Sequence, residues 1–269
     1  MGHPPVDCIR QFGYTILGKH SYQDLVPLPA YEYRNMPKNM LLECKDISFK
    51  YPGSTTEVFK NMSYRIAGPG FHALFGPSGV GKTTLAKMMT GEINGFSGDI
   101  SMQEIRRVLY TYNLERIPGW STVRDHLETT TPASNKEKIS QLVSSFGMEA
   151  CINSRFSQLS LGQQNRINLA RYLLQEFDLL IMDESLANVD EVTKENIILM
   201  MKAAFPDRCF LYISHNVAEV AKFCNQILVL RSQHKSPQTL SILGQDHSNT
   251  KALVRRDLEH TMLEIVNAF

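Results

Sequence analysis

The feature that most constrains this chain is the segment from Gly76 to Thr83, Gly-Pro-Ser-Gly-Val-Gly-Lys-Thr, which matches the pattern G-x-x-x-x-G-K-[ST] in full. A short apolar run precedes it at residues 71–75, and a helical pattern follows it at residues 83–90. Glycines in such a loop let backbone N–H groups turn inward around phosphate oxygens, and the helix start adds a favourable dipole. The motif therefore predicts a phosphate-binding loop between a strand and a helix.

Individual roles follow from the chemistry of this loop. We expect Lys82 to reach the β- and γ-phosphates of ATP and to act in catalysis, and we expect Thr83 to bind Mg²⁺ through its hydroxyl. The remaining nucleotide contacts expected from this segment are Gly76, Pro77, Ser78, Gly79, Val80, Gly81 and Thr84.

A second motif lies about one hundred residues further along the chain. The apolar run of residues 179–182 has the pattern of a buried strand, and Asp183 and Glu184 follow it directly. A strand that ends in a carboxylate is how this class of site holds Mg²⁺, so Asp183 is expected to bind the metal, through water. Glu184 is the candidate general base for the attacking water. An Asp-Glu pair at the end of a strand is weak evidence for a metal site on its own. It becomes strong evidence when a phosphate-loop motif precedes it in the sequence.

Strands that alternate with helices predict an α/β fold with a largely parallel central sheet. Further strands are expected at residues 41–49, 58–66, 107–112, 209–213 and 227–230. Helices are expected at residues 161–174, 191–204 and 217–224, and at residues 136–146 behind a cap at Ala133-Ser134.

Composition excludes several classes of function. The chain of 269 residues has 28 Lys plus Arg against 27 Asp plus Glu, so its charge is not that of a protein that coats nucleic acid or an anionic membrane. The five cysteines form no C-x-x-C pair and are interpreted as free thiols of a reducing compartment. No apolar run reaches the roughly 18–20 residues that cross a bilayer. We therefore expect a cytoplasmic protein whose role at a membrane depends on a partner.

A third motif suggests the family. Residues 159–166, Leu-Ser-Leu-Gly-Gln-Gln-Asn-Arg, resemble the L-S-G-G-Q signature of ABC ATPases, with Leu161 in place of the first glycine. Tyr51 stands where the family has its adenine-stacking aromatic residue, Ser185 to Asp190 stand at the D-loop position, and His215 stands at the H-loop position. The resemblance covers roughly residues 40–231, with its motifs in the family's order.

The resemblance implies a RecA-like P-loop core with an antiparallel β region and an inserted helical subdomain. It also implies two ATP-binding domains packed head to tail, each closing the other's nucleotide site. Ser160, Gly162 and Gln163 would then contact the γ-phosphate across the interface, where a helix start favours an anion. His215 would hold the γ-phosphate on the side of Lys82, and Asp190 would couple the two sites. Read from the residues alone, Tyr51 could instead be an edge-strand aromatic, and His215 could be the cap of the next helix.

Three positions depart from the family pattern. Asn113 stands where the family has a glutamine, which keeps the amide for Mg²⁺ or the lytic water on a shorter side chain. Leu161 adds bulk where a glycine lets backbone approach closely, unless its side chain points away. Ser185 replaces the usual proline after the catalytic glutamate. These departures predict slow or partner-dependent hydrolysis.

The expected organisation is an N-terminal extension at residues 1–38, an ATPase domain at 39–245 and a C-terminal helix at 246–269. The helical subdomain is expected at about residues 116–168. Residues 118–124 and 216–221 resemble segments of bacterial importer subunits of the nitrate, sulfonate and taurine group. Trp120 then either lines a groove for the membrane partner or packs in the helical core.

The function that these resemblances imply is that of a motor subunit of an importer. Its expected partners are a second ATPase subunit, usually an identical one, a transmembrane permease and a substrate-binding protein, with no nucleic acid. Two alternatives stay open: a soluble ABC ATPase, for example in iron–sulfur cluster assembly, and a regulatory nucleotide switch with weak hydrolysis.

Overall fold

The computed structural model describes residues 14–16, 25–27, 39–113, 115 and 119–269. The chain divides into two units, Met1–Lys38 and Asn39–Phe269. In the first unit, β1 (Tyr14–Ile16) and β2 (Leu25–Pro27) pair in antiparallel fashion. The rest of the expected N-terminal extension lies outside the described residues.

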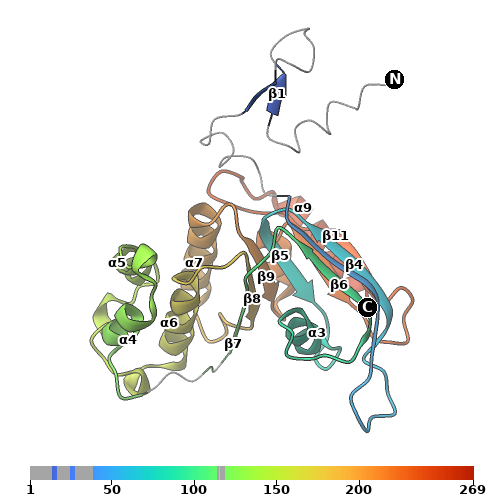
Figure 1. Ribbon diagram of the computed structural model, residues 1–269, viewed down its shortest axis with the longest axis horizontal. Coiled ribbons are helices and arrows are strands. Elements are labelled where there is room, and N and C mark those ends of the chain that lie inside the picture. Colours follow the sequence, from blue (N-terminus) through green and yellow to red (C-terminus); the bar gives the residue numbers. More distant parts are fainter. Residues whose placement is uncertain (1–13, 17–24, 28–38, 114, 116–118) are drawn as a thin grey trace. The chain divides into compact units, whose positions relative to one another are not determined.

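The centre of the second unit is a six-stranded sheet with the strand order β11-β10-β5-β9-β8-β7 (Figure 1). Five strands run parallel, namely β5 (Gly70–Phe75), β7 (Val108–Tyr112), β8 (Leu179–Asp183), β9 (Cys209–Ile213) and β10 (Gln226–Leu230). The sixth, β11 (Thr239–Leu243), pairs with β10 in antiparallel fashion. Strands β8 and β9 are buried on both faces along almost their whole length, which explains their unbroken apolar sequences. The α/β fold expected from the sequence is confirmed.

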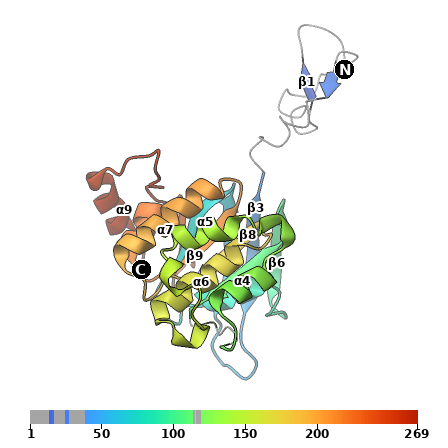
Figure 2. The same ribbon diagram turned by 90° about the vertical axis from the view of Figure 1, so that its left-hand side faces the viewer.

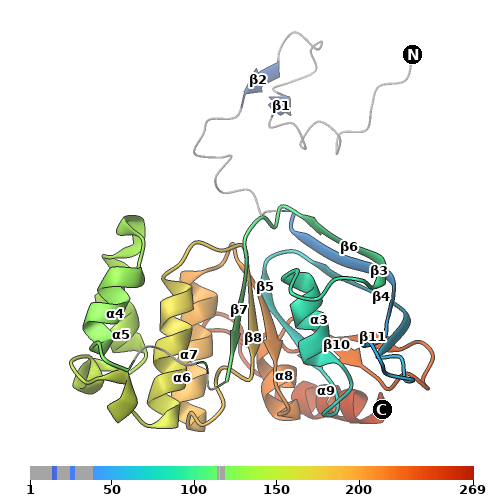
Figure 3. The same cartoon turned by 60° about the horizontal axis from the view of Figure 1, so that its bottom comes forward.

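Helices cover both faces of this sheet. On one face lie α6 (Leu161–Leu173), α7 (Glu191–Ala204), α8 (Val217–Phe223) and α9 (Arg255–Asn267), and their side chains share one apolar core with that face. Figure 2 shows α6 and α7 in front of the strands. On the other face, α3 (Lys82–Met89) lies between the central sheet and a second sheet (Figure 3).

The second sheet is antiparallel and has the order β4-β3-β6. Its strands are β3 (Leu41–Phe49), β4 (Phe59–Ala67) and β6 (Ser97–Gln103). Its inner face, with Leu42 and Ile47, packs in the same core as Leu85 of α3 and Ile181 of β8. Strand β6 was not predicted, because Ser-Gly-Asp-Ile-Ser-Met-Gln is mostly exposed and its apolar alternation is limited to Ile100 and Met102.

The segment between β7 and β8 is helical, with α4 (Val123–Thr130) and α5 (Lys138–Ser145) before α6. The cap predicted at Ala133-Ser134 for the helix at residues 136–146 is wrong. Ala133–Asn135 form a separate 3₁₀ turn, and α5 begins after Glu137, which makes no side-chain cap. The inserted subdomain at 116–168 stays a prediction, and residues 116–118 lie outside the described part of the chain.

The C-terminal helix is shorter than expected. It spans Arg255–Asn267, whereas residues 246–254 were included in the prediction. Those residues run along the surface, where Asp246 receives a hydrogen bond from Lys202. Among the described residues, no helix is both long enough and apolar enough to cross a membrane.

Candidate nucleotide site

The phosphate loop follows β5 at the carboxyl edge of the parallel sheet, where α/β folds bind ligands. At two positions of the loop, the surrounding atoms leave no room for a Cβ, so glycine is required. A Cβ on Gly76 would lie 2.4 Å from the carbonyl oxygen of Leu230. Gly81 has a φ of 110°, and a Cβ there would lie 2.7 Å from Val58 Cγ1 and 2.8 Å from Phe59 Cε1. The glycines that the motif specifies therefore let the loop backbone turn closely against β4 and β10.

Lys82 begins α3 and is almost fully buried. Its Nζ donates to the carbonyl oxygens of Gly76, at 2.7 Å, and Pro77, at 2.9 Å. Burial lowers the pKa of Lys82 from its ordinary value, while the carboxylates of Asp183 and Glu184 act in the opposite direction. The loop thus encloses a cation whose donors are held by backbone carbonyls, which fits a site for phosphate oxygens.

Asp183 ends β8 and meets two hydroxyl groups. Its Oδ2 accepts from Thr83 Oγ1 at 2.7 Å and from the hydroxyl of Tyr110 at 3.0 Å. Burial, and next the charge of Asp183, raises the pKa of Tyr110 well above its ordinary value, so the phenol stays protonated. A cluster of hydroxyl and carboxylate oxygens is the donor set that Mg²⁺ prefers. These residues therefore fit the metal that accompanies a nucleotide.

An open cavity of about 450 Å³ joins these groups. Its lining residues come from α3, β7 and β8 and from the segments that follow them, with one lining residue after the end of each element. They are Thr83, Lys87, Glu92, Tyr110, Tyr112, Asn113, Asp183 and Glu184. Tyr110 is a site residue that the sequence reasoning missed. The available signal was alternation, because Tyr110 and Tyr112 share one face of a strand that leads to Asn113.

Glu184 and His215 lie together at the ends of β8 and β9. His215 Nε2 is 2.6 Å from Glu184 Oε1, and the backbone N–H of Glu184 donates to the carbonyl of Ile213 at 3.0 Å. Glu184 has a φ of 52°, an unfavourable backbone conformation for a glutamate. His215 is not the helix cap, because the Asn216 side chain accepts the first N–H groups of α8.

Asn113 is tied to the signature helix. Its Oδ1 accepts from Nδ2 of Asn165 at 3.0 Å, and the same Nδ2 donates to the carbonyl of Ala187 at 2.5 Å. Asn165 is 2% exposed, so one buried amide links the end of β7, the start of α6 and the loop before α7. Sequence reasoning missed Asn165, because its role depends on contacts with distant segments.

The signature residues do not line this cavity. Ser160 and Gln163 form a capping box at the start of α6, with Gln163 N donating to Ser160 Oγ at 3.3 Å and Ser160 N donating to Gln163 Oε1 at 2.9 Å. A Cβ on Gly162 would lie 2.4 Å from the carbonyl oxygen of Asn188, so glycine is needed there. Leu161 is 49% exposed, so its added bulk points away from the interior of the chain.

Tyr51 stands at the edge of the phosphate helix. Its hydroxyl forms a 2.9 Å hydrogen bond with Thr84 Oγ1, and its ring packs edge-on against Phe49, 4.9 Å between centroids. The ring is still exposed enough to accept a flat base, so its role in stacking stays a prediction.

Of three further positions that the sequence analysis named, two have clear local partners and the third is exposed. Asp190 caps α7 by accepting from Thr193 N at 2.9 Å, and this bond lowers its pKa. The buried Ser185 donates to the carbonyl oxygen of Thr111 at 3.0 Å, a bond that a proline could not make. Trp120 is 80% exposed, so the alternative that it packs in the helical core is wrong.

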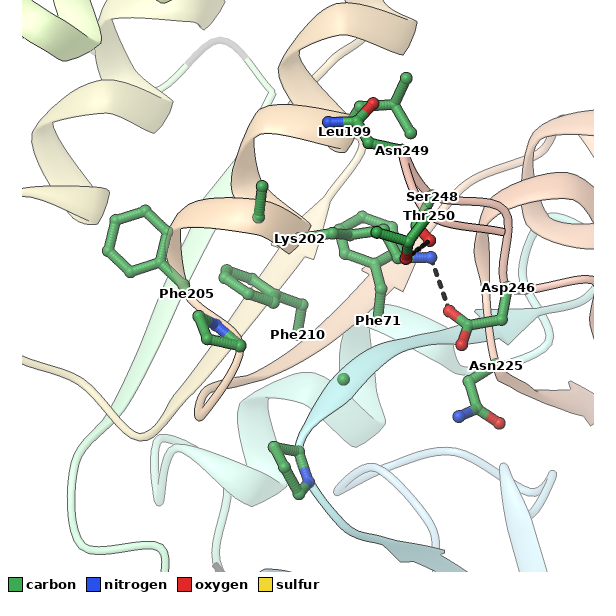
Figure 4. A pocket seen from close by; sticks show the side chains of 14 residues that line it. Phe71, Leu199, Lys202, Phe205, Phe210, Asn225, Asp246, Ser248, Asn249 and Thr250 are labelled. Carbon is green, nitrogen blue, oxygen red and sulfur yellow. Dashed lines mark hydrogen bonds and ion pairs between the residues drawn. The ribbon is translucent and has the colours of Figure 1, made fainter. Parts of the chain in front are cut away.

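A second cavity, of about 290 Å³, lies at the opposite, amino edge of the sheet (Figure 4). Lys202 is the cation among its lining residues, and all three donors of its ammonium group are in use. They reach Asp246 Oδ1 at 2.5 Å, the carbonyl of His247 at 2.7 Å and the carbonyl of Phe223 at 2.9 Å. Because the ammonium group of Lys202 is fully paired, this cavity has, among the described residues that line it, no free cation that could bind an anion, in contrast to the site at the carboxyl edge.

The fold and the site define a nucleotide-binding ATPase with a phosphate loop. Residues 59–187 match a family model described as ABC transporter. An uncharacterized ABC transporter ATP-binding protein of Haemophilus influenzae is 28% identical over 209 residues, which is 75% of this chain and 86% of that protein. The molybdenum import ATP-binding protein ModC of Saccharophagus degradans is 31% identical over 199 residues, which is 67% of this chain and 55% of that protein.

A solved structure, a bacterial Atm1-family ABC exporter with ATP bound, superposes with a TM-score of 0.66 at 19% identity. The match covers 76% of this chain and 39% of the exporter chain, and it supports the shared fold. The chain belongs to the ABC-type ATPases, as a nucleotide-binding subunit that hydrolyses ATP. The finer likeness to the nitrate, sulfonate and taurine group stays a prediction.

Proposed function

We propose that this ABC ATPase powers the import of a solute across a membrane through a separate transmembrane partner. The observation that carries the proposal is the convergence of Lys82, Thr83, Asp183, Glu184 and His215 at the carboxyl edge of one sheet. Import is supported by the similarity to ModC, which is a molybdenum import ATP-binding protein. Because the chain spans about half of that relative, its partners and its substrate belong to the proposal.

Each of these residues has a role that its surroundings support. Lys82 binds the β- and γ-phosphates once they replace the loop carbonyls as acceptors for its ammonium group. Thr83 and Asp183 hold Mg²⁺, which neutralises charge on those phosphates when it is bound. Glu184 orients or deprotonates the attacking water, and His215 keeps the Glu184 carboxylate in place and contacts the γ-phosphate.

Asn113 has a more limited role than the family's glutamine. Its Oδ1 already accepts a hydrogen bond from Asn165, so one lone pair of that oxygen is in use. The other lone pair and the two Nδ2 hydrogens are the groups that remain for Mg²⁺ or the lytic water. We expect this restriction to slow hydrolysis in the isolated subunit.

A second ATPase subunit, an identical copy in the simplest case, completes the site. Ser160, Gly162 and Gln163 lie outside the cavity of their own chain, at the exposed start of α6. The N-terminus of a helix attracts an anion, and the exposed N-terminus of α6 is accessible to a nucleotide bound by a neighbouring subunit. ATP bound between the two copies then favours the closed state, and hydrolysis removes that preference. The loop before Asp190 lies next to Gly162, through Asn188 and Val189, and Asp190 couples the two sites.

The test is a pull-down with tagged Glu184→Gln and Mg-ATP from a detergent extract of the source cells. A polytopic membrane protein recovered in comparable amount, together with a substrate-binding protein, supports the importer at the inner face of the cell membrane. Lys82→Ala with the same tag is the matched control, because it retains the surface and loses the nucleotide. Soluble partners alone would favour a machine such as a cluster-assembly ATPase, and no partner at all would favour a nucleotide switch.

A further inference from the structure

Tyr110 makes a contact at the metal site that neither the phosphate loop nor the signature accounts for. Its hydroxyl and that of Thr83 both donate to the same oxygen of Asp183, Oδ2. Among the described residues, no group donates a hydrogen bond to the other oxygen, Oδ1. Two donors on one oxygen fix the plane of a carboxylate and leave its other oxygen for a further ligand.

The position of the Tyr110 ring is set by the fold. Tyr110 pairs with Ile181 in the parallel register of β7 and β8, one pleat before Asp183. The ring is partly buried against the core around α3, and it packs on Tyr112 with 5.7 Å between centroids. A ring held on two sides has little freedom to turn, so its hydroxyl stays directed at the carboxylate.

We propose that Tyr110 is a positioning residue that orients Asp183 for Mg²⁺, an inference that rests on the proposed role of Asp183 as a metal ligand. Thr83 is itself expected to bind the metal. Of the two donors, only Tyr110 therefore has no role other than holding Asp183. A neutral phenol can do this without cancelling the charge of the carboxylate, which a lysine or arginine at the same place would do. Partners of this kind tune metal affinity through the ligand that they hold.

The test compares the binding of a non-hydrolysable ATP analogue with and without Mg²⁺. For the wild-type chain, the ratio of the dissociation constant in EDTA to that in excess Mg²⁺ measures how much the metal contributes. Tyr110→Phe keeps the ring and removes the donor. We expect this ratio to fall by about 10-fold, with the dissociation constant in EDTA unchanged.

A matched control is Tyr172→Phe. Tyr172 on α6 also donates its hydroxyl to a carboxylate, Glu115 Oε1 at 2.9 Å, but it lies outside the cavity. We expect its ratio to equal that of the wild type. An unchanged ratio in Tyr110→Phe, or an equal fall in Tyr172→Phe, would overturn the role of Tyr110. Absence of binding by the wild type under both conditions would instead overturn the proposed nucleotide site itself.

A double-mutant cycle with Asp183→Asn guards against a general loss of structure. If Tyr110 acts through Asp183, Tyr110→Phe lowers the ratio in the wild-type background and has no further effect in the Asp183→Asn background. A fall of equal size in both backgrounds means that the phenol acts by packing alone, and the inference is then wrong. Circular dichroism of each variant shows whether the fold is retained, and Tyr110→Trp supplies a second bulky ring without the phenol if the phenylalanine variant unfolds.

Discussion

His215 Nε2 lies 2.6 Å from Glu184 Oε1, so the candidate general base and the H-loop histidine are in direct contact. The two side chains come from the ends of adjacent parallel strands, where Asp183 pairs with Ile213. Both side chains are partly exposed, and Glu184 lines the open cavity. The contact means that a change at Glu184 alters the surroundings of His215 as well.

Glu184→Gln should stop hydrolysis and keep ATP binding. The amide has the shape of the carboxylate and can still contact His215, but it cannot take a proton from water. We expect turnover to fall by about 10²–10⁴-fold, the range for loss of a general base. Light scattering with Mg-ATP should then show a dimer. A monomer at saturating ATP would argue against pairing between identical copies.

Lys82→Ala should remove nucleotide binding or turnover. The lysine supplies the buried cation of the loop, and no other lysine or arginine among the described residues contacts the Gly76 and Pro77 carbonyls. Loss of a charge-assisted contact to phosphate should weaken ATP binding by at least about 10-fold. Calorimetric titration measures it directly. Lys87→Ala, one helix turn away at the rim of the cavity, is the control, and wild-type turnover in Lys82→Ala would contradict the phosphate-loop assignment.

Gly162→Ala tests the approach of the signature helix to the 185–190 loop. An added Cβ would stand 2.4 Å from the carbonyl oxygen of Asn188, so the backbone must shift. We expect the free energy of unfolding to fall by about 1–3 kcal/mol, as for overpacked interiors. Urea denaturation measures the change. Leu161→Ala at the exposed neighbouring position should cost less, and equal losses at the two positions would show that the contact with Asn188 is unimportant.

Parts of this molecule with a local sequence signal were predicted well. Strands β3 and β9 and helix α7 lie at their expected residues, because apolar runs and helical periodicity are local patterns. Strand β11 was missed, since its pairing with β10 is a long-range contact and its residues are half-exposed. Lys82, Thr83, Asp183 and Glu184 stand in motifs that a sequence displays. Alternation along β7 could have placed Tyr110 on the face of the site, but its hydrogen bond with Asp183 joins residues 73 positions apart, and no local pattern predicts that contact.

His72 makes stability depend on pH. It is 1% exposed, neither ring nitrogen has a hydrogen-bond partner of good geometry among the described residues, and burial lowers its pKa from 6.5 to about 4. The backbone of Gly68 and the charge of Asp246 act in the opposite direction, and Lys202 adds to the lowering. Between pH 6.5 and about 4 the unfolded chain therefore binds more protons than the folded chain at this residue, so stability falls as the pH falls.

The experiment compares the free energy of unfolding at pH 7.5 and pH 5 in the wild type and in His72→Leu. We expect the wild type to lose about 2 kcal/mol more than the variant over this interval, because only the wild type must bury a group that the unfolded chain protonates. His260→Leu, at an exposed histidine of α9, should behave as the wild type does. The same pH dependence in the wild type and in His72→Leu would show that His72 does not carry this effect.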